Sequence, residues 1–190
     1  FGGVNYFNPE YEIYTRYSYS SNEKKGLSNP VVGRTIEDKN GNLWIGTEGG
    51  GLNYYNRRTR EFKWYRPQEG RNSISHNNVK ALYYDADKEI IWIGTHLGGL
   101  NKLDIRSGHF THYRMEGNNP QSLPSDIIRD ITPYKDLLSI ATQNGVCLFN
   151  PANGQCRQLF KDSKEGKSIK MVADVVFDSE GTLWIAATGE

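Results

Sequence analysis

The chain has 190 residues, and its 23 Lys and Arg residues nearly balance its 22 Asp and Glu residues. This balance creates no field that would favour nucleic acid or a membrane surface as a partner. The apolar content of 36% is low, but 4 Trp and 12 Tyr supply large flat side chains that suit pleated sheets. No apolar run approaches the roughly 18 residues of a membrane span, and no signal peptide is apparent. We therefore expect no direct membrane contact in this segment. Because the chain opens on Phe1, we also expect it to be an interior piece of a longer protein.

One sequence pattern recurs along the chain. Its copies are "NLWIGTEGGGLNYYN" (42–56), "IIWIGTHLGGLNKLD" (90–104), the weaker "LLSIATQNGVCLFNP" (137–151) and the short "TLWIAATGE" (182–190). The tryptophan position is filled by Trp44, Trp92, Ser139 and Trp184. The glycine that opens the following strand is Gly3, Gly51, Gly99 or Gly145. A spacing of roughly 47 residues with strand-like composition predicts an all-β fold, a β-propeller segment of four repeat units.

Residues 79–113 give the clearest copy of one repeat. Strand A is predicted in "VKALYY" (79–84), and strand B in the continuous apolar run "IIWIGT" (90–95). Strand C follows in "GLNKLD" (99–104) and strand D in "HFTHY" (109–113), after a turn. Each blade is therefore predicted to be a four-stranded antiparallel sheet.

The whole chain can be divided in the same way. We predict strands C and D of a first blade in 1–17, and complete blades in 31–65, 79–113 and 127–160. Strands A and B of a further blade are predicted in 171–187. No segment has the 3.6-residue periodicity of an amphipathic helix, so no helix is expected.

The chain therefore contains two complementary half-blades, which leave two alternatives. The halves could pair and close a four-bladed ring, or they could be the ends of a segment cut from a wider, seven-bladed ring. Charged residues of strand A favour the wider ring, whose channel holds more water. Arg34, Arg129 and Asp174 are predicted to share one position of strand A, with Asp130 beside it.

Cys147 and Cys156 flank the turn "NPANG". A turn of that length places them diagonally across two strands, which is poor geometry for a disulfide. Free thiols are therefore favoured over a bridge, although the sequence leaves both states open.

The string D-x-x-G-x-L-W-I-G-T-x-x-G-G-L, read from Asp38, resembles the two-component regulator propeller repeat. The segments "SISHNNVKAL" (73–82) and "SLPSDIIRDI" (122–131) are similar to the lead-in of that repeat. WD-repeat blades fit less well because no Trp-Asp dipeptide occurs. Sialidase-type Asp boxes place Asp two residues before Gly, whereas Asp38 lies three before Gly41.

The resemblance implies the periplasmic or extracellular sensor of a hybrid two-component histidine kinase of the kind found in gut Bacteroidetes. Such a parent is an inner-membrane receptor that signals through a phosphorelay. The family resembles regulators of polysaccharide utilisation, so an oligosaccharide ligand and a homodimeric parent are implied. The segment itself is expected not to be an enzyme.

Metal and catalytic sites are not predicted. His109 and His112 lie three apart on a strand and point to opposite faces, so they cannot chelate one metal ion. The carboxylates are scattered over turns without the pairing that acid–base catalysis needs. We therefore expect no catalytic residue, no metal and no cofactor.

A ligand site is predicted where the B–C tips and the D–A loops of a propeller emerge on one face. The tips differ between copies while the surrounding frame repeats, as ligand-contacting positions would. The predicted ligand-binding residues are Glu48, His96, Gln143 and Asn144 from the tips, and Arg71, Asn72, His76, Asn77, Asn118 and Asn119 from the D–A loops. Trp64 and Tyr65 could add a stacking plane, or they could pack between blades.

Three classes of function remain open. The first is a ligand-sensing module, and the second is a scaffold for protein interaction or dimerisation, which exposed aromatic patches would favour. The third is a carbohydrate-active lyase or hydrolase, which requires a converging set of His, Tyr or carboxylate side chains.

Overall fold

The computed structural model describes residues 3–8, 13–160 and 169–188. The regular secondary structure of the described residues is β-strand, apart from one turn of 3-10 helix, η1 (Glu23–Lys25). The predicted all-β class is confirmed. The expectation of no helix is wrong at η1, because the Asn22 side chain accepts a hydrogen bond from Lys24 N at 3.1 Å and caps this turn. The chain divides into two compact units, residues 1–79 and 80–190, and each is described separately.

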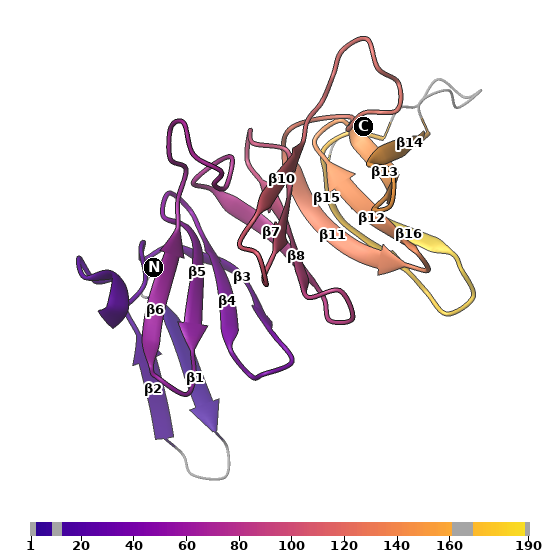
Figure 1. Ribbon diagram of the computed structural model, residues 1–190. Helices are drawn as coiled ribbons and strands as arrows, with labels where there is room; N and C mark the ends of the chain where they lie inside the picture. Colours follow the sequence, from indigo (N-terminus) through magenta and orange to yellow (C-terminus); the bar gives the residue numbers. More distant parts are fainter. Residues whose placement is uncertain (1–2, 9–12, 161–168, 189–190) are drawn as a thin grey trace. The chain divides into compact units, whose positions relative to one another are not determined.

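The first unit holds a two-stranded and a four-stranded antiparallel sheet (Figure 1). The smaller sheet pairs β1 (Val4–Asn8) with β2 (Ile13–Tyr17). The larger sheet has the order β3-β4-β5-β6, in which each strand neighbours the next in sequence. Its strands are β3 (Val32–Glu37), β4 (Leu43–Thr47), β5 (Gly51–Asn56) and β6 (Glu61–Tyr65).

The second unit contains two four-stranded sheets and a two-stranded sheet (Figure 1). The first sheet comprises β7 (Val79–Asp85), which begins at the last residue of the first unit, β8 (Ile90–Thr95), β9 (Leu100–Asp104) and β10 (Phe110–Tyr113). The second comprises β11 (Ile128–Tyr134), β12 (Leu137–Thr142), β13 (Gly145–Asn150) and β14 (Gln155–Leu159). Strands β15 (Val172–Phe177) and β16 (Leu183–Ala187) form the third. The predicted four-stranded antiparallel blade is confirmed.

The core of the second unit is built around the tryptophan of strand B. Trp92 is 1% exposed, and its ring lies 6.0 Å from that of Tyr113 and 5.4 Å from that of Phe149. Tyr113 belongs to the same sheet and Phe149 to the following one, so the indole joins two blades. In the first unit, Tyr55 and Phe62 take part in a corresponding cluster between β1–β2 and the larger sheet.

The repeated glycine at the start of strand C has a conformational cause. Gly99 has a φ of 68°, and a Cβ there would lie 2.3 Å from the carbonyl oxygen of Tyr113. Only glycine fits such a left-handed position beside a backbone atom. Thr95 Oγ1 donates to Gly99 O at 2.9 Å, and Thr47 and Thr142 donate to the corresponding glycines at 2.9 and 2.8 Å. The repeated threonine and the glycine that follows it, four residues on at Thr47 and Thr95 and three at Thr142, therefore form a B–C turn closed by a threonine hydroxyl.

The aspartate of the A–B turn anchors the tryptophan of strand B. Asp38 Oδ1 accepts hydrogen bonds from Asn40 N and Asn42 N at 2.9 and 3.0 Å. Its Oδ2 accepts from the indole nitrogen of Trp44 at 3.2 Å. Asp178 and Trp184 make the same bond at 2.7 Å. In the copy between them no aspartate lies six residues before Trp92, and the Trp92 indole nitrogen has no hydrogen-bond partner among the described residues.

The weakest copy replaces that indole with Ser139, which is fully buried. Ser139 pairs with Thr132 on strand β11, at the position that Trp44 occupies opposite Ile36. Even without the indole, strand β11 of this blade contacts strand β15 of the next sheet. Tyr134 stacks on Phe177 with 3.6 Å between ring centroids, and Thr132 Oγ1 donates to Val175 O at 3.0 Å.

The prediction for the charged position of strand A is wrong by one residue. Each of β3, β11 and β15 carries a β-bulge at the same place. Beyond each bulge, Thr35, Ile131 and Val175 all pair with the isoleucine that follows the tryptophan position of strand B, so these three residues are equivalent. Asp130, not Arg129, therefore shares the position of Arg34 and Asp174. Asp130 is buried, and its carboxylate lies 3.5 Å from Val175 N.

Cys147 and Cys156 are free and buried thiols on adjacent strands. Cys147 pairs with Gln158 and Cys156 with Phe149, so the two thiols are diagonal neighbours. Burial raises the pKa of Cys147 well above its usual value, and a hydrogen bond with Cys156 raises it further. The Cys147 thiol is therefore held away from the reactive thiolate form.

We expect both thiols to resist a disulfide reagent such as Ellman's reagent in the native protein and to react fully in denaturant. Burial blocks access and the raised pKa of Cys147 suppresses its thiolate. The measurement is the absorbance released over time with and without guanidinium. Release of both equivalents within seconds from native protein would contradict this packing.

Candidate functional site

In the first unit, the predicted ligand-binding residues are largely engaged in holding the loops. The carbonyl oxygen of Asn77 accepts from Gly49 N at 3.2 Å and from Gly51 N at 2.7 Å. His76 Nδ1 accepts from Asn78 N at 3.0 Å. Glu48 forms an antiparallel bridge with Asn78 through the backbone. These bonds tie the B–C tip to the D–A loop.

The other two predicted residues of this unit, Arg71 and Asn72, are exposed on the D–A loop. Arg71 Nη1 lies 3.4 Å from Gln68 Oε1. None of the five predicted residues lines the cavity found within the described part of this unit. The backbone of the first unit therefore brings the predicted tip and loop together, but outside that cavity.

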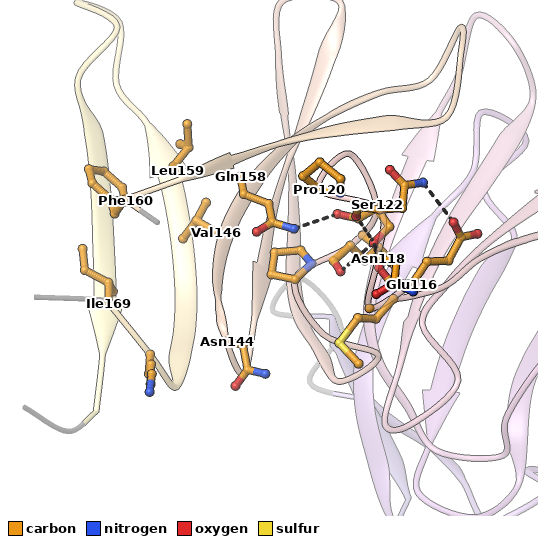
Figure 2. Close-up of a pocket in the computed structure, with 16 residues that line it drawn as sticks. Glu116, Asn118, Pro120, Ser122, Asn144, Val146, Gln158, Leu159, Phe160 and Ile169 are labelled. Carbon is orange, nitrogen blue, oxygen red and sulfur yellow. Dashed lines mark hydrogen bonds between the residues drawn. The ribbon is translucent and has the colours of Figure 1, made fainter. Parts of the chain in front are cut away.

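The second unit contains a groove of about 460 Å³ between the loop after β10 and the strands β13 and β14. Figure 2 shows that its two walls differ in chemistry. Val146, Leu159, Phe160 and Ile169 lie on one side, and the polar loop that carries Glu116, Asn118 and Ser122 lies on the other. Asn144 also lines the groove and lies below and between these two groups of side chains in the view of Figure 2.

The polar wall is held by its own hydrogen bonds (Figure 2). Asn119 Nδ2 donates to Glu116 Oε2 at 2.9 Å, and Ser122 Oγ accepts from Glu116 N at 2.9 Å. Gln158 Nε2 donates to Ser122 O at 3.1 Å, which joins the loop to β14. This network fixes the loop before a ligand arrives, and preorganisation of this kind lowers the cost of binding.

The apolar wall carries side chains that the backbone turns outward. Phe160 is 43% exposed and has a φ of 61°. A left-handed conformation is uncommon for a bulky residue, and such positions concentrate at ligand sites. Met115 is 48% exposed and also lines the groove. Exposed apolar surface beside fixed polar groups is typical of a binding site.

The groove contains three of the predicted residues: Asn118, Asn119 and Asn144. His96 and Gln143 do not line it. His96 forms a backbone bridge with Ile127. Gln143 N donates to Ile127 O at 3.1 Å and its carbonyl accepts from Met171 N at 2.7 Å, so its backbone holds two loops.

The sequence patterns do not indicate the groove residues that lie outside the B–C tips and the middle of the D–A loops, above all Glu116, Gln158 and Phe160. Of the two alternatives that the sequence leaves open for Trp64 and Tyr65, a stacking plane or packing, the contacts of both residues favour packing. The Trp64 indole donates to Gly26 O at 2.9 Å, and Tyr65 stacks on Trp44 with 5.7 Å between centroids.

Among the described residues, no group of three or more His, Cys, Asp or Glu side chains could hold a metal ion. No helix in the described ranges has the length and hydropathy needed to cross a membrane.

The blades, their repeated B–C turns and the groove define this chain as a β-propeller protein. Residues 26–49 and 73–96 match the family described as two component regulator propeller. These two segments match repeats of that family, so the predicted resemblance is confirmed. A search of curated proteins gives no significant match by sequence.

Solved structures support the same assignment. The extracellular domain of BT3049 from B. thetaiotaomicron, assigned to the hybrid two component systems, is 25% identical in sequence to this chain. The match covers 98% of this chain and 25% of the BT3049 chain, with a TM-score of 0.78. The extracellular domain of BT4673 from the same organism, assigned likewise, is 25% identical, with coverages of 99% and 26% and a TM-score of 0.74. PorZ, a surface component of the type-IX secretion system of Porphyromonas gingivalis, shares the fold at 18% identity, with coverages of 97% and 28% and a TM-score of 0.69. The chain thus spans about a quarter of the length of these structures.

Proposed function

We propose that this chain is a ligand-sensing module in the extracytoplasmic part of a hybrid two-component sensor kinase, and that its ligand is an oligosaccharide. The observation that carries the proposal is the groove of the second unit, in which an apolar wall faces a wall of amides and a hydroxyl. A sugar ring has the matching chemistry, because it presents an apolar C–H face and a rim of hydroxyl groups. The likeness to extracellular domains of hybrid two component systems supports the sensor role.

The charges of the groove favour a neutral sugar. Its lining includes one carboxylate, Glu116, and one ammonium group, Lys170, and its other polar side chains are amides and a hydroxyl. Glu116 is already bonded to Asn119. A uronate-rich chain would need several cations to offset its carboxylates, so we expect weaker binding of such a ligand.

Signalling would follow from contacts on both walls. A ligand that touches the loop at Asn118 and the end of β14 at Phe160 would favour the arrangement in which these segments are closest. In an inner-membrane receptor, such a bias would shift the equilibrium that controls the kinase and its phosphorelay. A dimeric receptor would couple two such modules.

A titration with defined oligosaccharides tests this function. Xylo-, manno- and galacturono-oligosaccharides of about four sugar units suit a groove of this size. For the best neutral ligand, Phe160→Ala is expected to weaken affinity about tenfold, because it removes the exposed ring that a sugar face would contact. Isothermal titration calorimetry measures the change.

Leu97→Ala is the matched control, because Leu97 is 55% exposed but lies outside the groove. It should leave affinity unchanged, as should His96→Ala. Equal affinities for wild type and Phe160→Ala would remove the groove as the binding site, and failure of the whole panel to bind would remove the oligosaccharide proposal.

The lyase or hydrolase alternative is less well supported. Hydrolysis of a glycosidic bond ordinarily uses two carboxyl groups, and Glu116 is the single carboxylate among the described residues that line the groove. Release of reducing ends from the same oligosaccharides would favour the enzymatic alternative.

A further inference from the structure

A second cavity of the second unit, of about 280 Å³, lies next to the groove and is called the turn pocket. It is bounded by the end of β10, by the loop that follows β10 and by the turn between β13 and β14. Four residues line both cavities: Glu116, Asn119, Ser122 and Leu123. Strands β10, β13 and β14 belong to the two complete blades of this unit, and the loop between these blades is a wall that both cavities share.

The walls of the turn pocket are fixed by hydrogen bonds. Cys156 N, near the start of β14, donates to Gln121 O at 2.7 Å and joins the loop to the neighbouring blade. Asn119 Oδ1 accepts from Gln121 N at 3.0 Å within the loop. On the turn, Asn153 Oδ1 accepts from Gln155 N at 3.0 Å. Walls that are already in place reduce the ordering that a ligand has to impose.

An aromatic ring lies beside the turn. Gly154 has a φ of 76°, and a Cβ there would lie 2.8 Å from Tyr113 Cε1. Glycine therefore lets the turn rest against the tyrosine ring. Because both residues line the turn pocket, Tyr113 adds an apolar contact to a lining that is otherwise largely polar.

Four of the side chains that line the turn pocket are amides: Asn119, Gln121, Asn153 and Gln155. In the part of the chain that the structure describes, the Gln121 side chain and Gln155 Nε2 have no hydrogen-bond partner. An amide group supplies donors and acceptors together, as a sugar hydroxyl does. The unused groups of the turn pocket therefore match the hydroxyl rim of a sugar.

The charged groups of the lining are already engaged. Arg114 Nε lies 3.2 Å from Asp126 Oδ2. Glu116 Oε2 accepts from Asn119 Nδ2 at 2.9 Å. A charged ligand would have to compete with these bonds, which are stronger than bonds between neutral groups. A neutral polyhydroxyl ligand therefore fits the turn pocket better.

We propose that the turn pocket binds a single neutral sugar ring, with Gln121 and Gln155 as its hydrogen-bonding residues and Tyr113 as its apolar contact. Its volume of about 280 Å³ suits one ring rather than a chain. The ring has two possible sources, a free monosaccharide or a branch of an oligosaccharide whose backbone lies in the groove. The second source rests on the proposed function, whereas the first does not.

Heteronuclear NMR of the isotope-labelled full chain, titrated with xylose, mannose and galactose, tests the first source. At least one sugar is expected to shift the side-chain amide signals of Gln121 and Gln155, with a Kd on the order of 1 mM. The double variant Gln121→Ala/Gln155→Ala should weaken this binding at least about fivefold, measured on the backbone signals of residues 153–156. Both substitutions keep the backbone bonds that hold the loop and the turn.

Gln68→Ala is the matched control. Gln68 is an exposed glutamine in the corresponding loop of the first unit, where Gln68 N donates to Ser73 Oγ as Glu116 N donates to Ser122 Oγ. This variant should bind the monosaccharide like wild type.

Branched and linear oligosaccharides of equal backbone length test the second source by isothermal titration calorimetry. A galactosyl branch on a manno-oligosaccharide, or an arabinosyl branch on a xylo-oligosaccharide, should raise affinity about tenfold because it binds at a high effective concentration. The double variant should remove this gain and leave the affinity of the linear chain unchanged. Phe160→Ala should weaken both.

A monosaccharide shift or a branch gain that the double variant abolishes supports the proposal. It is overturned if neither effect occurs, or if the double variant leaves the observed effect intact. In that case, linear binding that still depends on Phe160 would leave the proposed function standing. Conversely, monosaccharide shifts at the turn pocket without binding of any linear chain would remove that function and keep this site.

Discussion

Replacing Trp92 with Ala is expected to lower the free energy of unfolding of the second unit by about 3–5 kcal/mol. The indole is 1% exposed and contacts Tyr113 and Phe149, so its removal opens a cavity between two sheets. Strands hold the surrounding side chains in place, and collapse into the cavity would be incomplete. Urea unfolding followed by circular dichroism, at low protein concentration, measures the change.

Trp184→Ala is the matched control for that experiment. The residue occupies the same repeat position but is 62% exposed, so the same truncation removes little buried surface. We expect its unfolding midpoint to stay close to that of wild type. Equal losses from the two variants would mean that the indole contacts of Trp92 do not hold the blades together.

Replacing Asp38 with Ala is expected to cost about 2–4 kcal/mol, because it leaves several donors without an acceptor. Asp38 is 9% exposed. Its carboxylate accepts from Asn40 N, Asn42 N, the Asn42 amide and the Trp44 indole. The indole nitrogen would be left buried and unpaired. Thermal and urea unfolding of the full chain measure the loss.

Asp178→Ala provides the control, because Asp178 makes the same bond to Trp184 at an exposed turn. The indole N–H of Trp184 and the backbone N–H of Thr182 lower the pKa of Asp178 below its usual value. Its contribution is therefore present above the unfolded-state pKa and lost as pH falls through the lower folded-state pKa. Water can replace these bonds, so we expect a much smaller loss than for Asp38→Ala. If Asp178→Ala lost more stability than Asp38→Ala, burial of the Asp38 carboxylate could not be the reason for the large effect expected there.

The sequence predicts the blades because each repeated residue type has one physical role. Gly99 must adopt a left-handed backbone, Thr95 closes the turn, and Trp92 fills the space between sheets. The bond between Asp38 and Trp44 was not predicted, although its signal is present as an aspartate six residues before tryptophan. Ala86 lies six residues before Trp92, where the other two copies with tryptophan have aspartate, which explains why the Trp92 indole nitrogen has no hydrogen-bond partner among the described residues.

The ligand groove could be predicted only in part. The loop residues Asn118 and Asn119 were identified because polar D–A loops are natural contact points. His96 was chosen because the tips vary, yet its backbone is used to hold Ile127. Phe160 could not be foreseen, because its exposure depends on a left-handed φ of 61° that sequence patterns rarely indicate for an aromatic residue.

Hydrogen–deuterium exchange of the full chain, with and without the tightest oligosaccharide of the panel, tests the groove most directly. Slower exchange is predicted in residues 115–124 and 144–160, on both walls of the groove, with no change in residues 71–77. Protection confined to the first unit, or absent from both walls at saturating ligand, would contradict the account.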